Sequence, residues 1–301
     1  MAEERRALVR TLREELGRFS RAERRVARVL LTDYPEAGLT TVAALAARAG
    51  VSPPTVVRFA RRFGFASYAD FRSALRGELH KREAAPPKRL PARPAGDPAA
   101  GGSGRGGEAA GRETDRLLDH AGEVLSAGTR STLTSLPPDE LRAAVDLLSD
   151  RSNRLTLGGG RLTRPLAHYL ALRLMQLRPG TRLLPTDGVE LATLLADFGR
   201  RDVLVLFDYR RYEQDAAEVA RYAGAAGARI VLFTDRRLSP IAGTADVVLS
   251  SSVEAPSPYD SMVPTLAVVE TLLTQLARTA GGTARSRLAR VERVSREIRP
   301  R

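Results

Sequence analysis

The apolar residues of segment 42–49 recur at helical spacing, and the residues that follow predict where this helix ends. Gly50 stands where a tight turn needs a residue that can take a positive φ. A second helix then opens, with Ser52 placed to cap it and Pro53 in its first turn, where a missing N–H costs nothing. Residues 40–64 are therefore predicted to form two helices joined by a glycine turn.

The second helix of this pair has an apolar face and a polar face. Val51, Val56 and Phe59 are placed to pack against the first helix, which leaves hydroxyl and guanidinium groups outside. Such groups suit phosphate oxygens and guanine edges in the major groove of DNA. The candidate DNA-binding residues are Thr40, Ser52, Pro54, Thr55, Arg58, Arg61 and Arg62. The alternative is a helical hairpin with a solvated arginine face.

Further helices are expected on both sides of this pair. Apolar spacing predicts one helix over residues 3–16, and Ser20 with Glu23 forms a capping-box pattern that opens the next. Another helix is expected to run from Phe65 to near Leu79. Residues 1–80 are thus predicted to form an all-α helix-turn-helix domain.

The composition changes after this domain. Residues 81–112 lack apolar periodicity and are dense in Pro, Gly and Ala, so we expect a flexible, disordered linker. Two helical patterns occupy residues 113–149. The last residues, 281–301, are basic and carry apolar residues at helical spacing, which predicts a C-terminal helix or tail.

From Arg154 the chain alternates between short β-rich runs and helices. The predicted strands are 155–158, 182–184, 203–207, 229–233 and 247–249, and the predicted helices are 164–177, 189–198, 213–225 and 263–277. Alternation of this kind indicates an α/β domain with a five-stranded parallel sheet covered on both faces. Ligands of such sheets bind beyond the carboxyl ends of the strands.

The charge and composition of the chain limit the kinds of partner that the protein is expected to bind. The net charge of +13 fits a polyanion such as double-stranded DNA, and residues 1–90 hold 19 Lys and Arg against 10 Asp and Glu. With no Cys and three His we expect no metal, and no cofactor. No apolar run approaches the roughly 18 residues of a membrane span, and the charged start has no secretion signal. We therefore expect a cytoplasmic protein that does not enter a membrane.

The N-terminal residues resemble the DNA-binding domain of RpiR-type bacterial transcriptional regulators. The resemblance rests on the string AGVSxxTVVRFxRxxGF at residues 49–65 and on flanking residues between Phe19 and Phe71. It implies a sugar-isomerase-like (SIS) domain, expected over residues 113–280, that binds an effector and forms a homodimer or homotetramer. Three short runs in the second half match an SIS domain: Arg201-Asp202-Val203, Gly227-Ala228 before Thr234-Asp235, and Ala245-Asp246-Val247.

The effector loops depart from the pattern that this resemblance implies. An SIS domain carries a glycine-rich loop with a Ser after its first strand and a Ser-x-Ser-Gly-x-Thr phosphate cradle after its third. The candidate effector-binding residues in the corresponding places are Gly158, Gly159, Gly160, Arg161, Thr163, Asp208, Tyr209, Arg210 and Arg211. Asp208 would repel a dianion, whereas Arg210 and Arg211 would attract one. Thr163 can supply a hydroxyl or cap the following helix.

Three interpretations of these loops stay open. The site is altered and grips a small anionic metabolite such as a sugar phosphate, or it is lost and its charges are paired internally. In the third, Arg210 and Arg211 pair with Glu213 and Asp215 at a helix start.

The whole chain has two competing functions besides an effector-responsive regulator. A sugar-phosphate isomerase would need a general base, for which Glu254, His168 and Glu190 are the candidates. An attached DNA-binding domain and an altered cradle favour a non-enzyme with no catalytic residues. The other alternative is a DNA-binding protein whose SIS domain binds no ligand.

Overall fold

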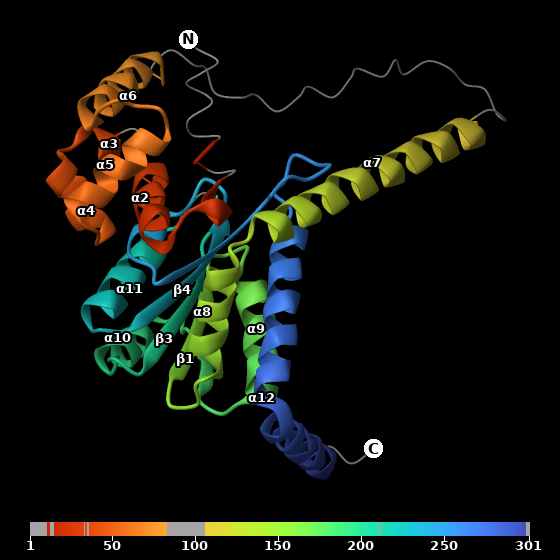
Figure 1. Ribbon diagram of the computed structural model, residues 1–301. Coiled ribbons are helices and arrows are strands. Elements are labelled where there is room, and N and C mark those ends of the chain that lie inside the picture. Colours follow the sequence, from red (N-terminus) through yellow and green to blue (C-terminus); the bar gives the residue numbers. More distant parts are fainter. Residues whose placement is uncertain are drawn as a thin grey trace.

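The computed structural model describes residues 11–12, 15–32, 34, 36–82, 106–210 and 212–298. A helical N-terminal domain packs beside an α/β domain, and two long helices extend from the body of the molecule (Figure 1). Within the described ranges, no helix combines the length and apolar composition needed to cross a membrane.

The N-terminal domain is built from short helices. In chain order they are the 3-10 turn η1 (Leu16–Arg18), α2 (Arg21–Thr32), α3 (Glu36–Leu39), α4 (Val42–Ala49), α5 (Pro53–Arg62) and α6 (Tyr68–Arg82). The predicted capping box is present, because Ser20 N–H donates to Glu23 Oε2 at 2.9 Å and Glu23 N–H donates to Ser20 Oγ at 3.3 Å. The expected helix over residues 3–16 lies largely outside the described residues.

An aromatic core closes this small domain. The Phe19 ring lies edge-on to the rings of Phe59 and Phe63, with centroids 5.7 and 5.8 Å apart. Phe71 packs against Phe65 and Tyr68 on the other side of the domain. Aromatic pairs in this geometry add to the stabilisation that their buried area provides.

The α/β domain begins with α7 (Gly106–Ser135) and α8 (Pro138–Ser149). The flanking helices overlap both ends of the predicted linker. Residues 81–82 complete α6, and α7 starts within the expected linker because Glu108, Ala109 and Ala110 favour helix. Residues 83–105 lie outside the described residues.

The predicted parallel sheet is confirmed, with strand order β2-β1-β3-β4-β5. Its strands are β1 (Arg154–Gly159), β2 (Thr181–Leu183), β3 (Asp202–Phe207), β4 (Arg229–Asp235) and β5 (Val247–Ser251). The remaining helical elements are α9 (Arg164–Leu177), α10 (Gly188–Ala196), α11 (Gln214–Ala225), the 3-10 turn η2 (Pro240–Gly243) and α12 (Val263–Ile298).

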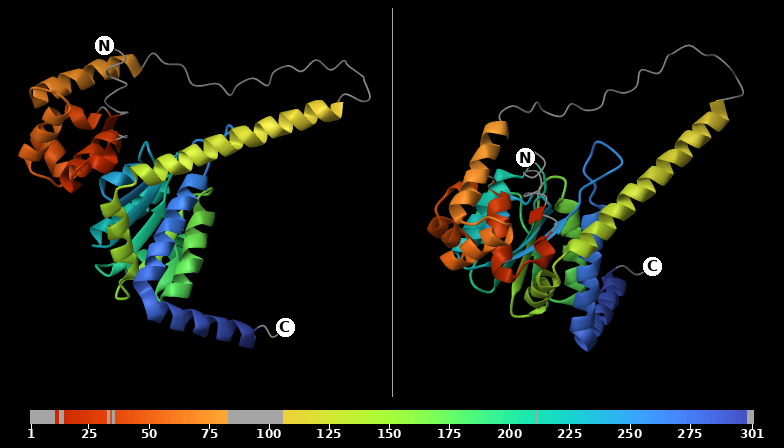
Figure 2. Two further views of the ribbon diagram at one scale, coloured as in Figure 1. Left: turned by 45° about the vertical axis from the view of Figure 1, so that its right-hand side comes forward. Right: turned by 45° about the horizontal axis from the view of Figure 1, so that its top comes forward.

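Successive side chains along each strand point to opposite faces of the sheet. Leu155, Val205 and Phe207 face one core with α8, α9 and α12, where the Phe207 and Phe233 rings stack 4.3 Å apart. The opposite face packs against α10, α11 and η2. Figure 2 shows these helical layers on both faces of the sheet.

The C-terminal helix is longer than expected. α12 runs through the predicted basic tail to Ile298, interrupted at Gly281, whose φ of 51° and ψ of −127° are not helical. Glycine accommodates this break because it has no Cβ. The second part of α12 extends away from the sheet domain (Figure 1).

Candidate DNA-binding and effector sites

The predicted glycine turn presents α5 after α4. Thr41 caps α4 by accepting a hydrogen bond from Ala44 N–H at 3.2 Å. Gly50 ends α4 with φ 59° and ψ 38°, and its N–H bonds to the carbonyls of Ala46 and Ala47. Pro53 occupies the first turn of α5 as predicted. The helix–turn–helix geometry therefore follows from local signals.

Near the start of α5, the Thr55 hydroxyl forms hydrogen bonds with the Ser52 hydroxyl and the Arg58 guanidinium. Ser52 is at the N-cap position, but the predicted cap bond is wrong, because its Oγ lies 2.9 Å from Thr55 Oγ1 instead. Arg58 Nη2 donates to Thr55 Oγ1 at 3.3 Å. Pro54 and Arg58 are exposed, so this end of the helix presents one hydroxyl and one cation.

Thr55 departs from the predicted outer face, whereas Arg62 is exposed as predicted but has partners within the domain. Thr55 is only 9% exposed, and its burial is tolerated because its hydroxyl has partners on both sides. Arg62 Nη1 lies 3.2 Å from both carboxylate oxygens of Glu23, and its guanidinium stands 4.9 Å from the centroid of the Phe19 ring. Arg62 thus fastens α5 to α2.

The remaining candidate DNA-binding residues differ in their surroundings. Arg61 is exposed in the last turn of α5. Thr40 is half-buried and donates from Oγ1 to the Ala37 carbonyl at 2.7 Å. The exposed part of the predicted DNA surface therefore consists of Ser52, Pro54, Arg58 and Arg61, with Arg62 partly engaged inside the domain.

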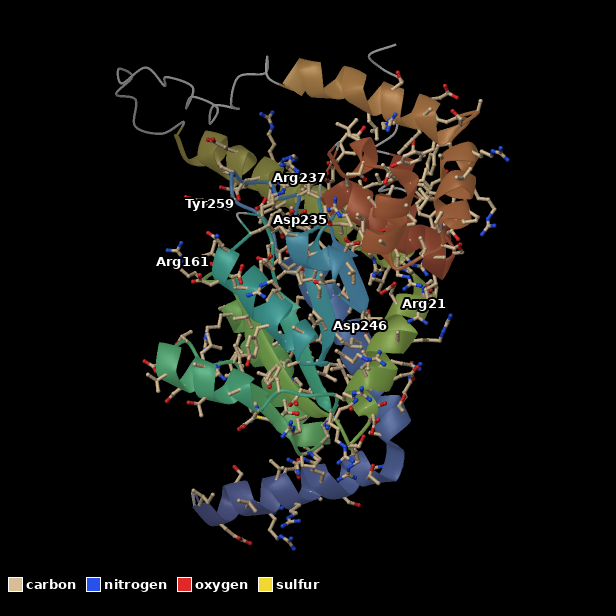
Figure 3. The ribbon with its side chains drawn as sticks, turned by 90° about the vertical axis from the view of Figure 1, so that its left-hand side faces the viewer. Arg21, Arg161, Asp235, Arg237, Asp246 and Tyr259 are labelled. Carbon is tan, nitrogen blue, oxygen red and sulfur yellow. The ribbon has the colours of Figure 1, made fainter. Side chains whose placement is uncertain are left out.

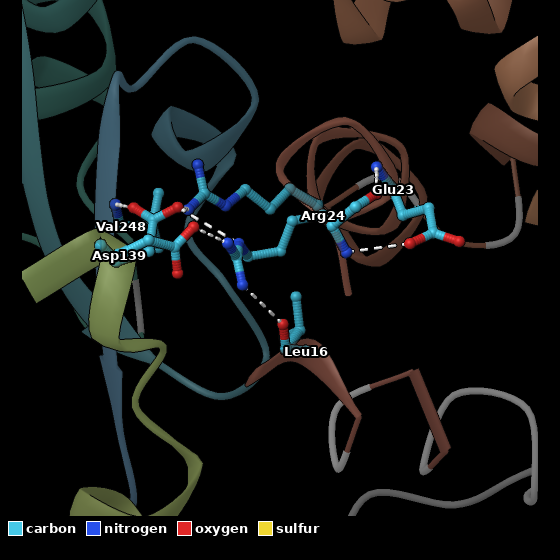
Figure 4. A network of polar contacts seen from close by, with 8 residues as sticks. Leu16, Glu23, Arg24, Asp139 and Val248 are labelled. Atoms are coloured by element: carbon cyan, nitrogen blue, oxygen red, sulfur yellow. Dashed lines mark hydrogen bonds and ion pairs between the residues drawn. The ribbon is translucent and has the colours of Figure 1, made fainter. Parts of the chain in front are cut away.

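Helix α2 faces the α/β domain, whereas α4, α5 and α6 lie on its far side (Figures 1 and 2). Arg24 and Arg28 of α2 are 3% and 4% exposed, and both pair with Glu140 of α8, which is 6% exposed. Arg24 also pairs with Asp139, and Glu140 Oε2 accepts from Val248 N–H at 2.8 Å (Figure 4). A buried ion-pair cluster therefore joins the two domains.

Apolar packing surrounds this cluster. Leu238, Ile241 and Ala242, in and before η2, belong to the same continuous core as the residues of α2. Gly17 lies so close to the end of α7 that a Cβ there would approach the Ser135 carbonyl oxygen to 2.8 Å. The recognition helix is thus held on a body that includes the sheet.

The glycine-rich loop after β1 is tightly packed. A Cβ on Gly159 would lie 3.0 Å from Arg164 N, and one on Gly160 would lie 2.9 Å from the Glu213 carboxyl group. Thr163 is buried and donates from Oγ1 to the Phe207 carbonyl at 2.7 Å. Its expected capping bond is therefore absent, because the hydroxyl secures the loop to the end of β3.

The first two residues after β3, Asp208 and Tyr209, are buried. Asp208 is 3% exposed and accepts hydrogen bonds from Glu213 N–H, at 3.2 Å, and from Ser239 Oγ. Burial raises the pKa of Asp208, although these hydrogen bonds oppose the shift. Tyr209 is buried as well, with its hydroxyl 3.0 Å from Ser251 Oγ.

The charged residues around these loops are paired within the chain. Arg210 Nη1 lies 3.0 Å from Asp260 Oδ1, and Arg161 Nε lies 3.8 Å from Glu213 Oε1. The third interpretation is therefore wrong for Arg210, because its partner is Asp260 from the segment before α12 and not Glu213 or Asp215. Arg211 lies outside the described residues.

The sequence interpretation missed several residues at the carboxyl edge of the sheet. Tyr212 donates to both oxygens of Asp235 at 3.1 Å, and Asp235 also accepts from Arg237 N–H at 2.6 Å. Figure 3 places Arg161, Asp235, Arg237 and Tyr259 at this edge, with Arg161 at its outer margin. The strand-ending Thr234-Asp235 pair was the signal that could have identified Asp235.

The three candidate general bases lie on separate elements. His168 belongs to α9, Glu190 to α10, and Glu254 to the segment after β5, and each side chain is exposed. Within the described residues, no group of three or more His, Cys, Asp or Glu side chains could hold a metal ion.

Two family models match the chain, and together they cover both domains. Residues 7–82 match the helix-turn-helix domain of the rpiR family, and residues 147–275 match the SIS domain. The fold and these matches define a DNA-binding transcriptional regulator with a C-terminal SIS domain. The chain belongs to the RpiR-type family of regulators.

Known proteins of similar sequence or fold were also found. The chain is 23% identical to the HTH-type transcriptional regulator HexR of Escherichia coli (strain K12) over 97% of its own length and 95% of that protein. It is 27% identical to the sugar isomerase domain of an RpiR transcription factor from Sphaerobacter thermophilus, covering 56% of this chain and 94% of that one with a TM-score of 0.52. The fold is also that of Vibrio vulnificus NanR complexed with ManNAc-6P, at 20% identity and a TM-score of 0.51, covering 98% and 100% of the two chains.

Proposed function

We propose that the SIS domain senses a small anionic metabolite, such as a sugar phosphate, and that this ligand changes how the protein holds its operator DNA. One observation carries the proposal. The glycine-rich loop after β1 already binds an anionic group, because Arg161 N–H donates to the Glu213 carboxylate at 3.0 Å. Backbone N–H groups at the carboxyl edge of a parallel sheet are a common anion site.

The identity of the ligand class draws support from the comparisons. The Vibrio vulnificus NanR structure contains ManNAc-6P, and the relative from Sphaerobacter thermophilus carries a domain named after sugar isomerases. Arg161 is 95% exposed at the side chain, so its guanidinium is free to reorient toward a ligand. Gly158, Gly159 and Gly160 are the other proposed contacts.

The proposed DNA contacts follow from α5. Arg58 is the proposed base-reading side chain, because it is exposed in the middle of α5 with its guanidinium oriented by Thr55. Ser52, Pro54 and Arg61, with Thr40 beside α4, are the proposed backbone contacts. Arg62 would contact DNA only if its ion pair with Glu23 were broken.

We infer that the protein acts as a homodimer, or as a tetramer of two dimers. A single recognition helix contacts few base pairs, so specificity requires two half-sites about one helical turn apart. Apolar side chains remain exposed on helices of the SIS domain, among them Leu117 and Leu118 on α7, Leu172 on α9, and Val263, Leu288, Val294 and Ile298 on α12. These faces support a subunit interface there.

We further infer that the protein is not an enzyme and that it works in the cytoplasm, beside the DNA. General-base catalysis needs a side chain poised next to the substrate with a tuned pKa. His168, Glu190 and Glu254 are all exposed side chains on separate elements. The DNA-binding domain supports regulation rather than turnover.

A specific observation favours a second function, in which the SIS domain binds no metabolite. Asp208, Tyr209 and Arg210 all have partners within the chain. A domain in this state would act in assembly and in holding the DNA-binding helices at a fixed separation.

A footprint of the protein on its own upstream region separates these functions. The experiment is repeated with a panel of sugar phosphates, amino sugars and small organic acids. The proposed sensor predicts protection of a palindrome that one compound alters. Protection that no compound alters would favour the ligand-free alternative, and the Arg58→Ala variant serves as the control for loss of specific contacts.

A further inference from the structure

The Glu213 carboxylate contacts the backbone of the glycine-rich loop after β1. Its carboxylate accepts the Arg161 N–H at 3.0 Å across 52 residues of sequence. The space for this carboxylate exists because residue 160 is glycine, since a Cβ there would lie 2.9 Å from Glu213 Cδ and Oε1. The Glu213 side chain therefore occupies the space beside Gly160 and Arg161 in this loop.

The Glu213 side chain has no role in its own helix. Glu213 is the N-cap residue of α11, yet its side chain makes no capping hydrogen bond. The helix start is supported instead by the Asp208 side chain, whose Oδ1 accepts the Glu213 N–H. Replacing the Glu213 side chain therefore leaves the first turn of α11 intact.

The contact between Glu213 and Arg161 is open to solvent, so a ligand can displace the Glu213 carboxylate. The Glu213 side chain is 39% exposed and that of Arg161 is 95% exposed, and ion pairs in water contribute little to stability. Asp208, by contrast, is buried and held by two donors, so it stays in place. An incoming anion would meet the charge of Glu213 first.

We propose that Glu213 is an internal anion that competes with the effector for the glycine-rich loop and sets its selectivity against compact dianions such as phosphate. The proposal rests on the proposed function only in that both use this loop. A ligand enters by taking the Arg161 N–H from Glu213, and the displaced carboxylate moves into solvent. Removing the carboxylate leaves the Arg161 N–H open to an anion.

The test uses inorganic phosphate and four full-length proteins: wild type, Glu213→Ala, Glu213→Gln and Glu218→Ala. Glu218 is the matched control, because it is an exposed glutamate on the same helix that pairs with Arg221 at 2.8 Å. Phosphate affinity is measured by titration calorimetry, and the Arg161 backbone amide is followed by NMR.

We expect Glu213→Ala to bind phosphate at least about tenfold more tightly than wild type, because a like charge has left the site. Glu213→Gln should fall between them, since its amide oxygen can still accept the Arg161 N–H. Glu218→Ala should match wild type. Phosphate should shift the Arg161 amide resonance most in Glu213→Ala.

Equal phosphate affinity in wild type and Glu213→Ala would overturn the proposal, as would tighter binding without a shift of the Arg161 amide. This outcome is distinguishable from failure of the proposed function. A regulator whose footprint responds to no compound could still gain phosphate binding in Glu213→Ala, and a responsive regulator could fail to gain it. Circular dichroism of each variant verifies that α11 is retained.

Discussion

Arg28 of the DNA-binding domain and Glu140 of the SIS domain form an ion pair in which both side chains are almost fully buried. Arg24 shares the same carboxylate, and the Val248 N–H at the sheet edge donates to its second oxygen. Burial lowers the pKa of Arg28, and the charge of Glu140 counteracts that shift. The Glu140 carboxylate is thus shared by both buried arginines at the boundary between the two domains.

Glu140→Gln should destabilise the protein by about 3–5 kcal/mol, because the buried Arg28 would lose its compensating charge and Arg24 would keep only Asp139. The free energy of unfolding from denaturant titration measures the effect. Asp139→Asn is the matched control, because Asp139 also pairs with Arg24 but its side chain is 42% exposed, so a loss of about 0–1 kcal/mol is expected. Equal losses in the two variants would mean that the domains do not dock through Glu140 in solution.

Arg58→Ala should weaken operator binding by about 1–3 kcal/mol and relax the base preference at one position. Fluorescence anisotropy with the operator and with single-base variants measures both effects. Arg221→Ala removes the same charge from an exposed site on α11, and we expect it to leave operator affinity nearly unchanged. Unchanged affinity and base preference in Arg58→Ala would remove this residue from the interface.

Gly50→Ala should destabilise the helix-turn-helix domain by about 1–2 kcal/mol, because a Cβ at a φ of 59° is strained. The opposite sign is expected for Gly122→Ala, which lies in the interior of α7 with open space around it and should gain about 0.5–1 kcal/mol. Thermal unfolding of both variants measures the contrast. A neutral Gly50→Ala would contradict the left-handed turn.

Asp208→Asn should change how stability depends on pH. The raised pKa of Asp208, caused first by burial, means that the folded state holds this proton more tightly than the unfolded state. The free energy of unfolding therefore falls as pH rises from the ordinary carboxyl pKa through the raised value. Asparagine removes this decline, so the stability of the variant relative to wild type should rise with pH over that window.

Denaturant titrations from acid to neutral pH test this expectation. Asp215→Asn is the control, because Asp215 is exposed in the first turn of α11. A stability difference between Asp208→Asn and wild type that stays constant with pH would show that Asp208 ionises normally in the folded protein.

Local signals in the sequence predicted most of the secondary structure and the order of the domains, although not the lengths of α7 and α12. Gly50, the Ser20–Glu23 capping box and the alternation of strands with helices each act within a few residues, so periodicity and turn chemistry predict them. The burial of Thr55 was not predictable in this way, because its hydroxyl is satisfied by Ser52 and Arg58, which spacing alone does not show.

Contacts between distant residues account for most of what the sequence did not predict. Arg161 meets Glu213 across 52 residues, Asp208 meets Ser239 across 31, and Arg24 meets Asp139 across 115. Each pair consists of common surface residue types, and only the folded chain brings them together. The loops after β1 and β3 were therefore predicted at the right places in the chain, while the partners of their charges were not, and their effector role stays a prediction.

The shared core between α2 and η2 has a consequence for how this protein can vary in sequence. Because docking fixes the position of the recognition helix, the separation of the two domains does not depend on the number of residues joining them. Doubling the length of a flexible connection raises its closure entropy cost by only about 0.6 kcal/mol. Insertions and deletions between residues 83 and 105 should therefore accumulate freely among relatives, whereas Arg24, Arg28 and Glu140 should change together or not at all.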